Sequence, residues 1–131
     1  MDILTPEQEK LLEQLEKHGV FRLAVKYSFT HTIITDLKGA ILYANQATQR
    51  ITGFPQQEII GKTPNIWGGL MSKEYYEEMW NTIREKQRPF ISEITNHKNT
   101  GEKYNAHIVI SPIFNEEDRL IGFVGTEEEI S

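Results

Sequence analysis

The four histidines are the residues with the broadest chemical range, since the chain has no cysteine. That absence excludes disulfides, thiolate metal sites, cysteine nucleophiles and thiol-linked cofactors. His97 and His107 flank a predicted hairpin, where they could approach one another, but two histidines without a third ligand make a weak metal signal. We interpret all four, with His31 on a strand and His18 on a helix, as surface or satisfied polar residues, and predict no metal site.

The acidic and glycine-rich segments do not form a recognisable catalytic motif. Glu127, Glu128 and Glu129 alternate at a strand end, so we interpret them as a solvated, charged terminus and not as carboxylates converging on a substrate. The pair Gly68-Gly69 is too short to cradle phosphate without a following lysine-serine pattern, and no nucleophile elbow or His-Glu-x-x-His motif is present. The sequence therefore predicts that the chain is not an enzyme.

Length and composition indicate one folded domain. The chain has 131 residues, of which 38% are hydrophobic and 10% aromatic, and a net charge of -5. The negative charge argues against nonspecific nucleic-acid binding, which depends on basic residues. No apolar run approaches the roughly 20 residues that span a bilayer, and the first residues do not resemble a secretory signal. We expect no membrane segment within this chain.

A helix is predicted over residues 6–18. Thr5 is its N-cap, Pro6 its first residue and Gln8 the partner in a capping box, while Gly19 ends it. Its narrow apolar stripe has two open interpretations: it packs on its own domain, or it forms a dimer interface. The stripe consists of Leu4, Leu11, Leu12 and Leu15.

The next part of the chain predicts a hairpin between short helices. A short helical pattern covers 21–29, and strands are expected over 31–36 and 40–44 around a turn that ends at Gly39. Asn45 is expected to cap a helix over 46–51 that closes at Gly53, and Pro55 opens another helical turn.

A longer amphipathic helix and three strands complete the pattern. Ser72 is the expected N-cap of a helix over 73–86, and Pro89 ends it. Strands are predicted over 90–97, 102–114 and 120–128. This order predicts an α+β fold with an antiparallel sheet and helices gathered on one face. The residues on the apolar face of the longer helix are Tyr76, Met79, Trp80 and Ile83.

Several short segments follow one another along the chain as a series of markers. They are the hairpin over 34–45 with its Asp-x-x-Gly turn, Thr52-Gly53-Phe54 with the segment 58–62, the polar turn over 96–101, the strand segment 110–113, and the exit over 125–131 with Glu129 in place of aspartate. This series resembles the PAS domain, a sensory module of bacterial signalling proteins. The resemblance covers residues 21–131, which leaves 1–20 as a flanking or dimerisation helix. It implies a five-stranded antiparallel sheet with short helices on one face.

In this family a cavity between sheet and helices is either filled by side chains or holds a cofactor or metabolite. The resemblance places a set of mostly apolar residues there, which suits a filled core or a flat ring ligand. The candidate lining residues are Asn45, Phe54, Trp67, Trp80, Phe90 and Asn96, together with Ile34 and Tyr43 on the first strands.

Flavin is the first cofactor that the resemblance suggests, because the region 74–101 is similar to flavin-binding PAS domains and Asn96 could donate to a flavin carbonyl. The sequence departs from those sensors at Phe90, where they commonly place tryptophan, and at Trp67-Gly68, where basic residues are found. The light-oxygen-voltage subgroup needs a cysteine for its adduct, so that photochemistry is excluded. Its second asparagine and its glutamine correspond to Ala106 and Glu127.

Haem is less favoured than flavin. It requires an axial ligand, usually histidine, and some haem-binding PAS domains place one on the longer helix. Residues 73–86 contain no histidine. The cofactor is therefore left unknown.

The resemblance implies a cytoplasmic sensory domain that binds a small ligand or a partner. It would relay a conformational change to an attached kinase, receptor or regulator, as in two-component signal transduction, and would form a homodimer through the first helix. One alternative is a ligand-free dimerisation module with a filled core. A third and more distant hypothesis is a flavin-dependent redox protein.

Overall fold

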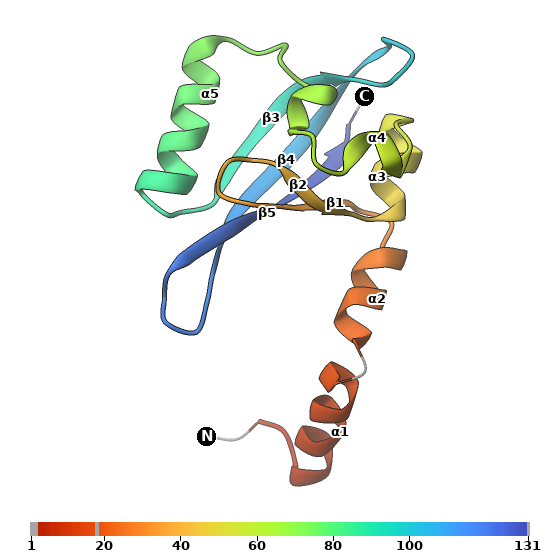
Figure 1. Ribbon diagram of the computed structural model, residues 1–131, viewed down its shortest axis with the longest axis vertical. Helices are drawn as coiled ribbons and strands as arrows, with labels where there is room; N and C mark the ends of the chain where they lie inside the picture. The colour runs from red at the N-terminus through yellow and green to blue at the C-terminus, as the bar shows by residue number, and fades with distance from the viewer. Residues whose placement is uncertain (1–2, 18, 131) are drawn as a thin grey trace.

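A five-stranded antiparallel sheet organises the computed structural model, which describes residues 3–17 and 19–130. The strands are β1 (His31–Thr35), β2 (Ile41–Ala44), β3 (Phe90–His97), β4 (Lys103–Phe114) and β5 (Leu120–Glu129), in the order β2-β1-β5-β4-β3. The two strands nearest the chain ends, β1 and β5, therefore lie side by side in the middle of the sheet (Figure 1). The predicted α+β fold with an antiparallel sheet is confirmed.

Short helices connect the two parts of the sheet. They are α3 (Gln46–Thr52), α4 (Gln56–Ile59), the 3-10 helix η1 (Pro64–Ile66), α5 (Lys73–Trp80) and the π-helical segment η2 (Asn81–Glu85). The expected caps are present: the Asn45 side chain accepts from Thr48 N, and the Ser72 side chain accepts from Tyr75 N. Gly53 ends α3 with a φ of 78°, a conformation that favours glycine.

The prediction of one continuous α-helix over 73–86 is wrong for its second half. The α-helix ends at Trp80, and the next five residues form a wider π turn in which Lys86 N donates to Asn81 O. The Thr82 hydroxyl also donates to Glu78 O, four residues earlier, and such back-bonding bends helices. The turn nevertheless keeps Ile83 buried on the face that also carries Trp80, as predicted.

Two further helices, α1 (Pro6–Lys17) and α2 (Val20–Tyr27), precede the sheet and extend away from it (Figure 1). The predicted capping box is formed, because Thr5 N donates to Gln8 Oε1 and Gln8 N donates to Thr5 Oγ1. Gly19, at a φ of 72°, separates the two helices. The proposed last residue of the first helix, His18, lies outside the described residues.

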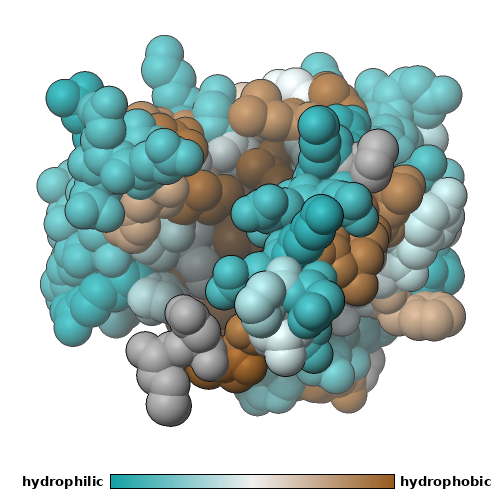
Figure 2. All heavy atoms as spheres, turned by 90° about the horizontal axis from the view of Figure 1, so that it is seen from below, coloured by the Kyte–Doolittle hydropathy of each residue, from teal (hydrophilic) through white to brown (hydrophobic). Residues whose placement is uncertain are grey.

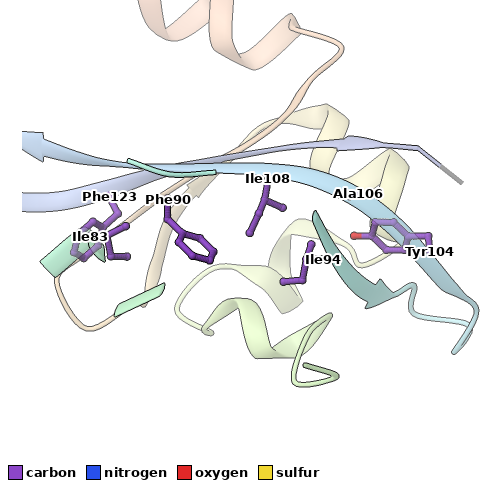
Figure 3. Packing of buried hydrophobic residues seen from close by; sticks show 7 residues of the cluster. All are labelled: Ile83, Phe90, Ile94, Tyr104, Ala106, Ile108 and Phe123. Atoms are coloured by element: carbon purple, nitrogen blue, oxygen red, sulfur yellow. The ribbon is translucent and has the colours of Figure 1, made fainter. Parts of the chain in front are cut away.

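The core lies between the inner face of the sheet and the helices. Strand side chains such as Phe90, Ile108 and Phe123 point to this side (Figure 3). A second cluster surrounds Trp67 and includes Ile33 and Ile59. The alternation of buried and exposed residues along β4, from Lys103 to Val109, shows that one face of the sheet is covered and the other is open.

Candidate functional site

A cavity of about 430 Å³ lies between the sheet and the helices. That volume is within the range of about 300–1,000 Å³ that small-molecule sites occupy. Its wall is mainly apolar, and His31, Asn96 and Glu127 form a polar cluster at one end. The apolar lining residues are Ile33, Ile94, Ile108, Ile110 and Phe123 from the strands, and Trp67, Met79, Trp80 and Ile83 from the helical side.

Three of the candidate lining residues named from the sequence lie on this wall, namely Trp67, Trp80 and Asn96. The structure places the other candidates elsewhere. Phe90 belongs to the hydrophobic cluster below the sheet and contacts Tyr75 edge-on. Phe54 packs against the ring of His97.

The candidates on the first strands also lie away from the cavity lining. Ile34 and Tyr43 are register partners in β1 and β2. The guanidinium of Arg22, from α2, lies 5.5 Å from the centre of the Tyr43 ring. These two residues therefore belong to the side of the hairpin that meets the N-terminal helices.

Asn45 acts as a buried connector. Its side-chain oxygen accepts from Thr32 N at 3.0 Å and from Thr48 N at 3.2 Å. Its side-chain nitrogen donates to Val25 O at 2.9 Å and to Thr30 O at 2.7 Å. One amide thus links α2, the start of β1 and the start of α3.

Glu127 forms the centre of the polar end of the cavity. Its Oε1 accepts hydrogen bonds from Asn96 Nδ2 and from the Tyr104 hydroxyl, both at 3.1 Å. Its Oε2 lies 3.3 Å from His31 Nε2. Only 8% of Glu127 is exposed, so this carboxylate is held inside the fold by three neighbouring side chains. Burial and the adjacent carboxylate together raise the pKa of Tyr104, which keeps its hydroxyl a donor.

His31 is the most deeply buried member of this group, with 1% of its surface exposed. Its ring meets the ring of Trp67 edge-on at 5.2 Å between centroids. Burial lowers the pKa of His31, and this effect outweighs the opposing attraction of Glu127. We therefore assign a neutral imidazole with its hydrogen on Nε2, which is the nitrogen that has an acceptor in range.

Two polar atoms of this end have no hydrogen-bond partner within the protein: His31 Nδ1 and Asn96 Oδ1. Both residues line the cavity. Buried polar groups are normally paired, because an unpaired group costs about 1–3 kcal/mol. Both atoms are themselves buried, so the fold encloses them without pairing them.

Two expectations from the sequence are wrong at this site. Glu127 was expected in a solvated terminus and His31 among surface or satisfied residues, yet both are buried and His31 Nδ1 is unpaired. The signal that could have found Glu127 is strand alternation, since residues two apart share a face and Phe123 is four residues away. The same two-residue alternation along β1 puts His31 on the face that carries Ile33 and Thr35.

Among the described residues no group of three or more histidine or acidic side chains could hold a metal ion. The suggested approach of His97 and His107 is wrong, because they pair with Lys103 and Glu93 respectively. That places them four positions apart along the ladder, about 13 Å at 3.3 Å per residue.

A five-stranded antiparallel sheet with a cavity between it and several short helices defines a small α+β domain. The PAS fold family model matches residues 7–130. The chain therefore belongs to the PAS fold family.

Curated relatives of known role match most of the chain. It is 28% identical over 114 residues to the nitrogen fixation regulatory protein of Klebsiella oxytoca, covering 86% of this chain and 23% of that protein. It is also 28% identical over 114 residues to a blue-light-activated histidine kinase of Brucella anthropi, covering 85% of this chain and 23% of that protein. The chain thus spans about a quarter of the length of these relatives.

Solved structures agree on the fold. The PAS domain of a protein from Colwellia psychrerythraea aligns with a TM-score of 0.78 at 22% identity, covering 87% of this chain and 97% of that one. An RNA-binding light-oxygen-voltage receptor aligns with a TM-score of 0.80 at 17% identity, covering 99% of this chain and 36% of that one. In the described part of the protein, no helix has the length and apolar character that crossing a membrane requires.

Proposed function

We propose that this PAS domain is a sensory module that binds a small molecule in its cavity and passes a conformational change to protein attached at its two ends. The observation that carries the proposal is the placement of the polar end of the cavity. His31 and Glu127 are register partners on β1 and β5, the strands next to the two ends of the chain.

Few residues separate the polar end of the cavity from the N-terminal and C-terminal elements of the domain. His31 begins β1, and Asn45 bonds both to this segment and to Val25 in α2. Glu127 lies two residues before the end of β5, and Ile130 N donates to Asn105 O just beyond it. A ligand that changes the position of either side chain acts directly on a terminal element, which is what a two-state relay requires.

The alternative of a ligand-free module with a filled core is less well supported. The cavity of about 430 Å³ favours a module that receives a ligand. Asn96 gives no particular support to flavin, since its amide nitrogen donates to Glu127. Flavin therefore remains one ring compound among several, and the redox-protein hypothesis has no further support.

The relatives suggest what the module would control. Their printed names describe a nitrogen fixation regulator and a light-activated histidine kinase, and the chain matches 23% of each. We infer that any kinase or regulatory output lies outside these residues, in a cytoplasmic signalling protein. The chain itself would act as a binding domain and not as an enzyme. We propose 1–20 as the flanking segment and 21–131 as the PAS domain.

We further propose a homodimer through α1. Leu11 and Leu15 are solvent-exposed, at 54% and 39%, and none of the residues of α1 is fully buried. Viewed from the α1 end of the molecule, hydrophobic side chains lie at the base of a hollow framed by hydrophilic ones (Figure 2). A second copy would cover apolar surface that the chain alone leaves in water.

The dimer is tested by replacing Leu11 and Leu15 with glutamate and measuring the mass in solution. We expect the wild type to have the mass of a dimer and the double variant that of a monomer. Ile60→Glu, at an exposed apolar residue away from α1, is the matched control and should stay dimeric. A double variant with unchanged mass would exclude α1 as the interface.

Ligand binding is tested by native mass spectrometry and an absorption spectrum of the purified chain. We expect a small molecule to remain with the wild type and to be lost from Ile94→Phe, which places a ring in the cavity. Ile91→Phe is the control, since Ile91 lies on the same strand and is 75% exposed. A wild type without bound molecule that also fails to take up small molecules in solution would refute the proposal.

A further inference from the structure

We propose that α1 of one copy packs against α2 of a second copy, in a symmetric dimer whose two-fold axis passes near Gly19. The inference rests on the proposed homodimer through α1, and it names the surface that α1 covers. The contact forms twice in each dimer, because the symmetry that brings α1 to the second copy also brings the α1 of that copy back.

Each of the two helices carries an apolar stripe that its own chain leaves in water. On α1 the stripe includes Leu11 and Leu15, which are four residues apart and therefore lie on one side of the helix. On α2, Leu23 and Tyr27 have the same spacing and are 48% and 62% exposed. Because both stripes are exposed, α1 and α2 do not cover each other within one chain.

Acidic side chains border the stripe of α1. An α-helix has about 3.6 residues per turn, so side chains three or four positions apart are neighbours. By this spacing Glu7, Glu9 and Glu16 flank the leucines, whereas Lys10 and Lys17 lie on the opposite side of the helix. Two α1 stripes that faced each other would therefore bring glutamates together, and like charges beside a helix–helix contact disfavour the pairing.

Basic side chains border the stripe of α2. Arg22 and Lys26 are four residues apart and form the column next to its apolar stripe, and both are exposed. Residues 17–35 include no aspartate or glutamate. Among the described residues neither cation forms an ion pair with a carboxylate, and each lies over an aromatic ring. The stripe of α2 thus has the charge that complements the acidic border of α1.

The order of the helices lets these two stripes meet. Beyond α2, α1 continues away from the sheet, with Gly19 between them (Figure 1). If two such segments lie antiparallel about an axis near Gly19, positions equally far from Gly19 face each other. Leu15 then faces Leu23 of the second copy, and Glu16 faces Arg22 of that copy. A parallel pairing would instead set α1 against α1, with its glutamates together.

Cysteine cross-linking tests this arrangement, because the chain has no cysteine of its own. Leu15→Cys, Leu23→Cys and the variant with both substitutions are prepared in the full chain and oxidised with copper phenanthroline. On a non-reducing gel we expect a covalent dimer from the double variant and little from either single variant. Equal cross-linking of Leu15→Cys alone would show α1 on α1 and overturn the inference. A disulfide within one chain, or no cross-link, would overturn it as well.

Exchanging the charges at the same contact is a second test. Arg22→Glu replaces an attraction to Glu16 by repulsion at both contacts, and we expect the dissociation constant of the dimer to rise about fivefold or more. Adding Glu16→Arg should restore most of the affinity. Lys10→Glu, on the opposite side of α1, is the control and should change the constant by less than about twofold. Analytical ultracentrifugation measures all four proteins, and a double exchange without recovery would contradict the pairing.

These outcomes are separable from those of the proposed function. If glutamate at Leu11 and Leu15 gives a monomer but Leu15→Cys alone cross-links, the dimer through α1 stands and its pairing with α2 falls. If the wild type is a monomer, the proposed dimer and this inference fail together, and retention of a small molecule still decides the sensory module.

Discussion

His31 and Glu127 face each other across neighbouring strands, with His31 Nε2 3.3 Å from Glu127 Oε2. This pair joins the polar end of the cavity to the two strands nearest the chain ends. Ligand recognition and transmission would therefore share the same side chains.

Removing the Glu127 carboxylate should destabilise the fold. Glu127→Ala leaves Asn96, Tyr104 and His31 without their shared acceptor, and we expect a loss of about 2–5 kcal/mol in the free energy of unfolding. Glu128→Ala, at the next residue, which is exposed, should change the free energy of unfolding by less than about 0.5 kcal/mol. Urea denaturation measures both values. Similar midpoints for the two variants would show that Glu127 is not a structural centre.

The stability should fall as the pH drops below 6.5. Burial lowers the pKa of His31 in the folded state, so the unfolded chain takes up the proton first as the pH falls. His31 therefore contributes most above pH 6.5, and the loss is at most about 1.4 kcal/mol per pH unit below it. Urea denaturation of the wild type and of His31→Gln at several pH values measures this; the variant should show a flatter profile. A wild type that gains stability on acidification would contradict the assignment of a neutral His31.

Asn45→Asp should loosen α2 while keeping the cap of α3. Aspartate retains the oxygen that accepts from Thr48 N but loses the two donors to Val25 O and Thr30 O, and it sets a negative charge against those carbonyls. Hydrogen exchange should become faster in residues 20–27 and stay nearly unchanged in 46–52. Unchanged exchange in 20–27 would mean that α2 is held by other contacts.

Gly53→Ala should cost more than Gly61→Ala. Both glycines have positive φ, 78° and 84°, so each alanine meets about 1–2 kcal/mol of backbone strain. At Gly53 the new Cβ would also overlap the Asn99 side chain, which donates to Gly53 O; at Gly61 nothing lies within 4 Å. Thermal unfolding should show the larger loss for Gly53→Ala. Equal losses would show that the Asn99 contact contributes nothing.

Sequence signals that lie close to each element were sufficient to predict most of the fold. The caps at Thr5, Asn45 and Ser72 are each made by one side chain and a backbone group three residues on, so the sequence near each helix start predicts them. The π turn after Trp80 was not predictable in this way. It depends on Thr82 bonding back to Glu78 and on the burial of Ile83 against the sheet.

The site was only partly predictable because its polar end is made by pairing across distant strands. Trp67, Trp80 and Asn96 could be named from the resemblance. His31 and Glu127 are 96 positions apart, and each looks ordinary alone: a histidine on a strand and an acidic residue among others. Their contact follows from the β1–β5 register, which only the assembled sheet defines.

The central claim is that the state of the cavity is transmitted to the chain ends, and hydrogen exchange on cavity-filled protein tests it most directly. Ile94→Phe places a ring in the cavity as a stand-in for a ligand, and Ile91→Phe places the same ring on the exposed side of β3. We predict altered exchange in residues 20–27 and 127–130 for Ile94→Phe, with wild-type exchange there for Ile91→Phe. Exchange at both ends that is the same in the wild type and the two variants would contradict the claim.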